Sequence, residues 1–292
     1  MKRLLVALGI ALGSVCAVRT ADAEVTGSWL YDAAAKTISD GNWTLNVQVN
    51  DTPNKLLKVG TSAGSDAVEN AYVAGEGILD LTKPVLTADG VQWFVAAIAD
   101  GAFKQCSHVT DIRLGGPKLA SIGGQAFYTC ANVTNLELSA ENMTTLSWSA
   151  FANLGTAGTS CVTVKRIFLP KITEVNYGPF ANVAHQYEGN GTLSRGEDVY
   201  MPLLSTISGA AFQGQWTPTR VYSWKGPMRF PSAKTVAASF ANLQGLDVLE
   251  VGRGDLKSVA EQAFNLVRGD SIILGCGTNR LDLAKQLFRY SD

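Results

Sequence analysis

A short phrase that recurs along the chain constrains its fold more than any other feature. Each copy places an aliphatic residue shortly before a phenylalanine, as in Ile98-Ala-Asp-Gly-Ala-Phe103. The phenylalanines of the seven copies lie 24, 24, 29, 32, 28 and 24 residues apart. A repeat of this length predicts a solenoid of stacked coils, in which equivalent residues superpose along the axis. We therefore expect one buried column made of Phe103, Phe127, Phe151, Phe180, Phe212, Phe240 and Phe264.

An alternating segment follows each phenylalanine after a short polar turn. In the first copy it is Val109–Leu114, where Ile112 and Leu114 would face the core and leave Asp111 and Arg113 outside. Alternation with a period of two predicts a half-buried strand. One short strand per coil means that the strands of successive coils pair in parallel, and stacking provides the continuous core.

The repeat unit resembles the BspA-like leucine-rich repeats, whose pattern reads approximately I-x-x-x-A-F-x-x-C-x-x-L-x-x-I-x-L. The second copy fills that pattern with Ile122, Ala126, Phe127, Cys130, Val133, Leu136 and Leu138. Later copies depart from it, since Pro179 replaces the alanine and Val183 and Leu243 replace the cysteine. The resemblance extends over about residues 76 to 290. It implies a leucine-rich repeat solenoid and a bacterial secreted or surface protein used for adhesion or recognition, with no ligand named and no shared catalytic residues.

The first residues are typical of a secretory signal peptide. Lys2 and Arg3 precede the apolar run Leu4–Leu12, and small residues at positions 21 and 23 predict cleavage after Ala23. We therefore expect residues 1–23 to be a signal peptide, 24–75 an N-terminal β module or cap, and 76–292 the solenoid with a C-terminal cap. The mature protein is expected to be secreted, periplasmic or held at the cell surface, with no transmembrane segment.

Both ends of the solenoid need a cap, because an open end exposes the core. At the N-terminal end, Trp29–Tyr31, Trp43–Val49 and Leu56–Val59 are predicted strands. Packing is the preferred role of the two tryptophans in these strands, and glycan binding is the alternative. Ile78–Leu81 is predicted to be the first repeat-like strand. At the other end, Leu281–Phe288 is predicted to form a capping helix.

The composition and the motifs of the chain reduce the number of functional classes to consider. The formal net charge is -1, so no basic excess attracts nucleic acid. The chain has two histidines, His108 and His185, and we find no motif for a phosphate loop, a nucleophile elbow or a metal-binding helix. We predict no enzymatic activity, no cofactor and no metal. A protein or glycan at a cell surface is the expected partner.

Two of the cysteines occupy equivalent positions in adjacent coils. Cys106 and Cys130 each follow a column phenylalanine by three residues. Stacked coils lie about 4.8 Å apart, which is close to the range that a disulfide needs. The pair is therefore either a disulfide or two buried thiols that act as small hydrophobic residues, and we prefer the second interpretation.

The outward positions of the strands suggest a binding surface in the central coils. Aligning the strands by their core residues places an aromatic row beside a row of charged residues: Phe168, Tyr200 and Tyr222 beside Arg166, Asp198 and Arg220. Exposed aromatics next to arginine are typical of interaction hot spots. The alternative is a ladder of like residues that stabilises the sheet. The preferred function is non-catalytic recognition through this face, and a structural envelope or matrix component is the alternative.

Two Arg-Gly-Asp tripeptides also fall in predicted turns. They consist of Arg253, Gly254 and Asp255, and of Arg268, Gly269 and Asp270. Host-integrin binding is one interpretation of these motifs. Turn chemistry is the preferred one, because glycine and aspartate are enriched in turns for conformational reasons.

Overall fold

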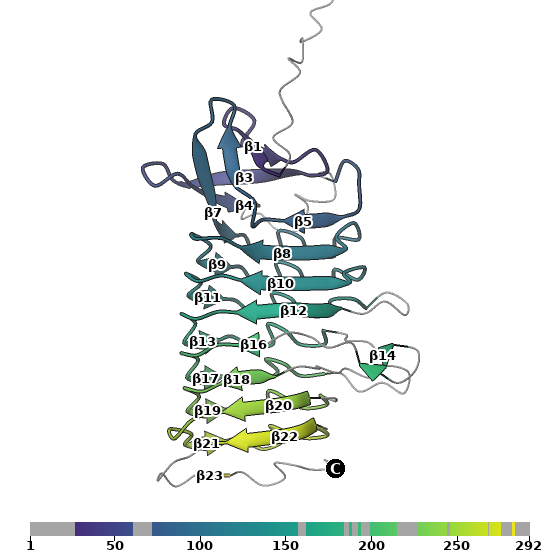
Figure 1. Cartoon of the computed structure of the whole chain (residues 1–292), viewed down its shortest axis with the longest axis vertical. Helices are drawn as coiled ribbons and strands as arrows, with labels where there is room; N and C mark the ends of the chain where they lie inside the picture. Colours follow the sequence, from purple (N-terminus) through teal and green to yellow (C-terminus); the bar gives the residue numbers. More distant parts are fainter. Residues whose placement is uncertain are drawn as a thin grey trace, which may run out of the picture.

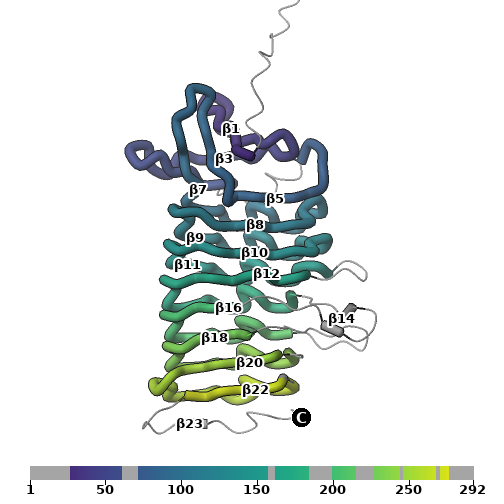
Figure 2. The backbone as a smooth tube through the Cα atoms, in the orientation of Figure 1, coloured from purple at the N-terminus to yellow at the C-terminus, as the bar shows by residue number. Residues whose placement is uncertain are grey.

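The computed structural model describes residues 27–60, 72–156, 162–183, 187–188, 192–193, 199–214, 227–243, 246–267, 269–275 and 282–283. The predicted signal peptide lies outside these residues. The predicted solenoid is present: coils stack one after another along the long axis, and the N-terminal strands lie at one end (Figures 1 and 2). No α-helix occurs in the described part of the chain.

One strand of each coil, in most coils the longer one, contributes to one parallel sheet, as the alternating segments predict. Neighbouring strands pair from coil to coil, and aliphatic residues at alternate positions, such as Ile112 and Leu114, face the core. In order along the solenoid the strands are β5 (Ile78–Asp80), β8 (Asp111–Gly115), β10 (Asn135–Ser139), β12 (Thr163–Phe168), β16 (Val199–Tyr200), β18 (Met228–Phe230), β20 (Leu246–Val251) and β22 (Gly269–Leu274). Below we call this the long-strand face.

The expectation of one strand per coil was wrong, because each complete coil has a second, short strand. The aliphatic residue that opens each repeat phrase faces the core, and the residue before it faces outward, so the two form a minimal alternating strand. These strands also pair in parallel from coil to coil, except that the third and fourth of the series lie in different sheets. They are β7 (Gln92–Ile98), β9 (Ser121–Ile122), β11 (Thr145–Leu146), β13 (Glu174–Val175), β17 (Thr206–Ile207), β19 (Thr235–Val236), β21 (Ser258–Val259) and β23 (Asp282–Leu283).

The phenylalanine column is confirmed. All seven rings are fully buried. Neighbouring ring centroids lie 4.9 to 5.7 Å apart, with interplanar angles of 1° to 11°. The turns that carry the rings are linked from coil to coil, as where the Phe103 and Phe127 amides donate to carbonyls of the following coil at 2.7 Å. The column is therefore held by its own stacking and by the backbone around it.

The N-terminal strands continue the short-strand sheet beyond the first coil. They are β1 (Trp29–Asp32), β2 (Thr37–Ser39), β3 (Thr44–Asp51) and β4 (Leu56–Val59), joined by antiparallel pairing. β4 then pairs in parallel with β7, and β6 (Val85–Thr87) pairs with both β1 and β7. The three strands predicted in this segment are present, and Ile78–Asp80 forms the predicted first repeat-like strand.

The two tryptophans of the N-terminal strands pack, as preferred. Trp29 and Trp43 are both fully buried. Their indole Nε1 atoms donate to the backbone oxygens of Asp80 and Ile78 respectively, each at 2.8 Å. Each buried indole N–H is therefore satisfied by β5, and neither ring is available to stack on a sugar.

The predicted C-terminal helix is not supported. Asp282 and Leu283 form β23, which pairs in parallel with β21 and sets Leu283 opposite Val259. In the sequence, Phe288 follows Leu283 by five residues, as Phe264 follows Val259. The apolar spacing that suggested a helix is therefore also the spacing of the repeat phrase. The other residues of the predicted helix lie outside the described part of the chain.

A further pair of short strands, β14 (Tyr187–Glu188) and β15 (Thr192–Leu193), is antiparallel.

The two equivalent cysteines are buried thiols, and no disulfide joins them. The Cys130 thiol donates to the Phe103 carbonyl oxygen at an Sγ–O distance of 2.9 Å. Burial, and then the neighbouring Cys106, raise the pKa of Cys130 well above its usual value. The thiol is therefore held in its protonated, poorly nucleophilic form. Cys161 and Cys276 lie outside the described residues.

We expect the Cys130 thiol to resist alkylation in the folded protein. Iodoacetamide at pH 8 should leave the Cys130 peptide unmodified in native protein and modify it in urea, because only the thiolate reacts and burial suppresses it. Peptide mass spectrometry measures both states. Rapid modification of Cys130 in native protein would contradict the buried position.

Candidate functional site

Two aromatic rings and one guanidinium lie together on the long-strand face. Phe168 on β12 is directly opposite Tyr200 on β16. Their ring centroids are 6.2 Å apart at an interplanar angle of 20°, and the Arg166 guanidinium carbon lies 4.7 Å from the Phe168 ring centroid. Both rings are partly exposed and Arg166 is exposed. We call Arg166, Phe168 and Tyr200 the aromatic pair site.

Local sequence explains why these rings point outward. Phe168 lies between Ile167 and Leu169, and both of these aliphatic residues are fully buried. Tyr200 has the same arrangement on β16, between Val199 and Met201. A slip of one residue would expose the aliphatic residues and bury the rings, so the register is strongly specified.

The prediction that Tyr222 lies next to Tyr200 in the aromatic row was wrong. The residue opposite Tyr200 on the next strand is Arg229, not Tyr222. The strand there is β18, whose Met228 and Phe230 are fully buried on either side of Arg229. In the sequence, Ser223 follows Tyr222 where the strand pattern calls for a second aliphatic residue. Tyr222, Arg220 and Asp198 all lie outside the described residues.

The predicted alignment of the outward rows also needs correction. Phe168 is opposite Ser139, and Arg166 is opposite Glu137. The ladder shifts between Leu136 and Glu137, where β12 has one additional residue, and alignment by core residues does not reveal such a bulge. The first outward row therefore alternates in charge along four coils: Asp80, Arg113, Glu137 and Arg166.

Part of this charged row is an ion-paired cluster. Arg113 Nη2 lies 3.0 Å from Asp111 Oδ2, and its Nη1 lies 3.9 Å from Asp80 Oδ2. The hydrogen bonds that Arg113 donates to the Asp111 carboxylate raise the pKa of Arg113. Asp111 was expected outside but is buried, and Arg113 compensates its charge. This cluster satisfies its own charges, so it offers less to a ligand than the aromatic pair site does.

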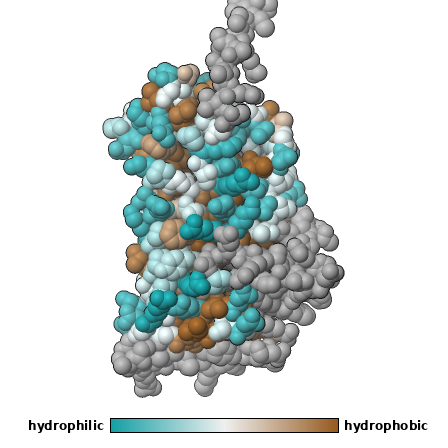
Figure 3. All heavy atoms as spheres, viewed as in Figure 1, coloured by the Kyte–Doolittle hydropathy of each residue, from teal (hydrophilic) through white to brown (hydrophobic). Residues whose placement is uncertain are grey.

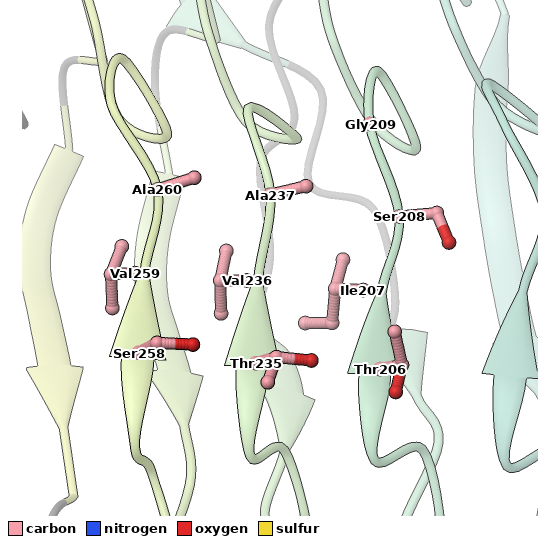
Figure 4. Close-up of a pocket in the computed structure, with 10 residues that line it drawn as sticks. All are labelled: Thr206, Ile207, Ser208, Gly209, Thr235, Val236, Ala237, Ser258, Val259 and Ala260. Atoms are coloured by element: carbon pink, nitrogen blue, oxygen red, sulfur yellow. The ribbon is translucent and has the colours of Figure 1, made fainter. Parts of the chain in front are cut away.

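The short-strand face carries an open groove with a volume of about 670 Å³. β17, β19 and β21 lie side by side beneath it, and equivalent residues stand at matching heights (Figure 4). Thr206, Thr235 and Ser258 give a row of hydroxyls, and the aliphatic residue after each is buried. The lining side chains carry hydroxyl and methyl groups and no charge. This groove offers contact surface without a general acid or base.

Titratable residues do not gather elsewhere in the described part of the chain. No group of three or more histidine, cysteine, aspartate or glutamate side chains is placed there to hold a metal ion. The His108 ring stacks on Tyr72 at a centroid distance of 4.4 Å, and His185 lies outside the described residues. The described residues also contain no helix with the length and apolar content needed to cross a bilayer.

The two Arg-Gly-Asp tripeptides differ in their surroundings. Arg253 is exposed in a bend and forms an ion pair with Glu250, and Gly254 has a φ of +127°. Residues 253 and 254 of this tripeptide lie in a bend between β20 and β21. The second was expected in a turn as well, but Gly269 and Asp270 begin β22, where Gly269 pairs with Leu246. Arg268 lies outside the described residues.

Across the surface seen in the view of Figure 1, hydrophobic residues form small patches among hydrophilic ones (Figure 3). We therefore single out the Phe168–Tyr200 pair by the chemistry and geometry of its side chains. It is not singled out as part of a broad apolar surface.

Of the comparisons with known proteins, the family comparison supports the repeat pattern. A search of curated proteins gave no match. Among solved structures, the chain is similar to a leucine rich cell surface protein from Faecalibacterium prausnitzii, at 13% identity over 82% of this chain and 76% of that one, with a TM-score of 0.28. The family model of the BspA type leucine rich repeat region matches residues 93–186 in six copies. The coils within residues 93–186 therefore belong to the BspA-type leucine-rich repeats.

Proposed function

We propose that this protein is a non-catalytic recognition or adhesion protein, secreted or held at the cell surface, that binds a protein or glycan through the long-strand face. The observation that carries this proposal is the stacked pair Phe168 and Tyr200 with Arg166 beside it. The repeat family and the predicted signal peptide are consistent with an exported protein. The partner itself is part of the proposal.

Three physical features favour binding at this face. The parallel ladder fixes both backbones, so little backbone freedom is lost on association. Aromatic rings and arginine are the residues enriched in hot spots. Arg166 stacks on the Phe168 ring, which leaves a rigid surface with both apolar and charged character. Because charge lies beside the rings, a protein partner is favoured over a neutral glycan here.

The alternative is a structural component of an envelope or matrix. Cross-strand pairing of Phe168 and Tyr200 contributes about 0.2–1 kcal/mol to the sheet, and this contribution requires no ligand. A purely structural protein would use the pair in this way or in contacts between its own copies. Binding measurements on a folded variant separate the two functions.

We expect replacement of both rings to weaken partner binding strongly without unfolding the protein. An array of extracellular-matrix proteins and glycans probed with the chain from Glu24 should identify a partner, and F168A/Y200A should weaken that binding at least about tenfold, as loss of a hot spot does. The matched control is I273A, since Ile273 is exposed at 49% in the same outward row on β22. Unchanged binding by a folded F168A/Y200A variant would leave sheet stabilisation as the role of the pair.

A further inference from the structure

A separate groove crosses the turns that cover the phenylalanine column. Its volume is about 330 Å³, and it spans several central coils. Ala152 and Ala181 each follow a column phenylalanine and leave room for the groove. The same position holds the larger side chains Tyr128 in the coil before and Gln213 in the coil after, and both line the groove.

Amide side chains line this groove. Asn153 and Asn182 lie in equivalent positions two residues after the column, with φ angles of 60° and 55°. Asn182 Nδ2 donates to Asn153 Oδ1 at 3.0 Å. Neither Asn153 Nδ2 nor Asn182 Oδ1 has a hydrogen-bond partner among the described residues. The ladder therefore presents one open donor group and one open acceptor group to the groove.

Two exposed aromatic rings lie at these turns; Tyr177 lines the groove, and Trp148 lies in the preceding coil outside the lining. Trp148 and Tyr177 are each three residues before a column phenylalanine, and they are 51% and 66% exposed. The flanking coils have Gly124 and Gly209 at this position. A Cβ atom on Gly124 would lie 2.6 Å from Trp148 Nε1, and one on Gly209 would lie 3.4 Å from Tyr177 Cε2. The glycines thus make room for each ring to lie over the neighbouring coil while remaining exposed.

From this geometry we infer that the turn face of the central coils is a binding site for a neutral oligosaccharide. Sugar rings offer C–H faces that stack on Trp and Tyr, and hydroxyls that exchange hydrogen bonds with amides. None of the side chains that line the groove is charged. Lys104 lies over the Tyr128 ring, 5.7 Å from its centroid, but is not part of the lining.

The spacing of the coils suits an extended sugar chain. The column rings beneath the groove are 5.2 Å apart between Phe127 and Phe151 and 5.5 Å apart between Phe151 and Phe180. A pyranose unit in an extended chain has a similar length, so successive sugars would meet equivalent groups on successive coils. This site is distinct from the aromatic pair site, where arginine accompanies the rings.

Affinity electrophoresis through gels that contain mixed-linkage β-glucan, galactomannan, xylan or soluble starch tests the inference, with polygalacturonate as the acidic comparison. We expect at least one neutral polysaccharide to retard the full chain. W148A/Y177A should weaken that binding at least about tenfold, because it removes both stacking surfaces. The control L203A removes a side chain that is equally exposed, at 51%, and does not line the groove. L203A should bind as the unmodified chain does.

A second variant tests the amides without removing a ring. N153D keeps the oxygen that accepts from Asn182, and aspartate tolerates the left-handed backbone there, so the fold should persist. Loss of the Asn153 amide NH2 donor should weaken neutral polysaccharide binding roughly three- to tenfold, the size expected for one hydrogen bond. Circular dichroism verifies folding of each variant. Absence of retardation by all four neutral polysaccharides, retardation by polygalacturonate alone, or unchanged binding by folded W148A/Y177A would overturn the inference and leave the long-strand face untouched.

Discussion

Replacing Phe151 with alanine is expected to lower the free energy of unfolding by about 3–5 kcal/mol, the usual cost of removing a buried phenylalanine. The ring is fully buried and stacks between Phe127 at 5.2 Å and Phe180 at 5.5 Å. Its removal leaves a cavity in the middle of the column. Backbone hydrogen bonds fix the distance between neighbouring coils, so the coils cannot move together to fill the cavity. Urea denaturation followed by circular dichroism measures the change.

The control for Phe151→Ala is L203A, which removes an exposed side chain. Surface substitutions of this kind change stability by about 0.5 kcal/mol or less. If Phe151→Ala cost no more than L203A, the column would not be a principal source of stability, and the repeat register that places the ring inside would be in doubt.

Deleting residues 24–75 is expected to cause aggregation of the remaining solenoid. We propose that this segment is the N-terminal cap. Its deletion removes β1 to β4, leaves β7 without its partner β4, and removes the two tryptophans that pack against β5. An unpaired strand edge beside an exposed apolar face pairs readily with other chains.

Size-exclusion chromatography of a chain that begins near Gly77, beside the chain that begins at Glu24, tests the cap. We expect the longer chain to elute as a discrete species and the shorter one to elute in the void volume or precipitate. A stable monomeric short chain would show that residues 24–75 are an independent module.

The parts of the fold that depend on residue identity alone were predictable from the sequence. The column phenylalanine and the two core positions of the strand, which Ile112 and Leu114 occupy in the first copy, recur from coil to coil. Stacking must bring such equivalent residues together. Features that depend on one extra residue were not predictable in this way. The bulge in β12 moves Arg166 opposite Glu137, and only the hydrogen-bonded ladder reveals it.

The same contrast applies to the candidate sites. Phe168 and Tyr200 were found because each lies between two core residues of its strand. The aromatic pair on the turn face was missed, although the sequence carried a signal for it. At the position three residues before the column, four successive copies read Gly124, Trp148, Tyr177 and Gly209. Comparing that position between copies would have shown two aromatic rings flanked by glycines.

Hydroxyl-radical footprinting of the protein, alone and with the partner identified on the array, tests recognition through the long-strand face most directly. Without partner, we expect oxidation of the partly exposed Phe168 and Tyr200 and none of the buried Phe151, which serves as an internal reference. With partner bound, oxidation of Phe168 and Tyr200 should fall while other exposed aromatic residues react as before. Equal oxidation of these two rings in both samples, or protection confined to another surface, would contradict recognition through this face.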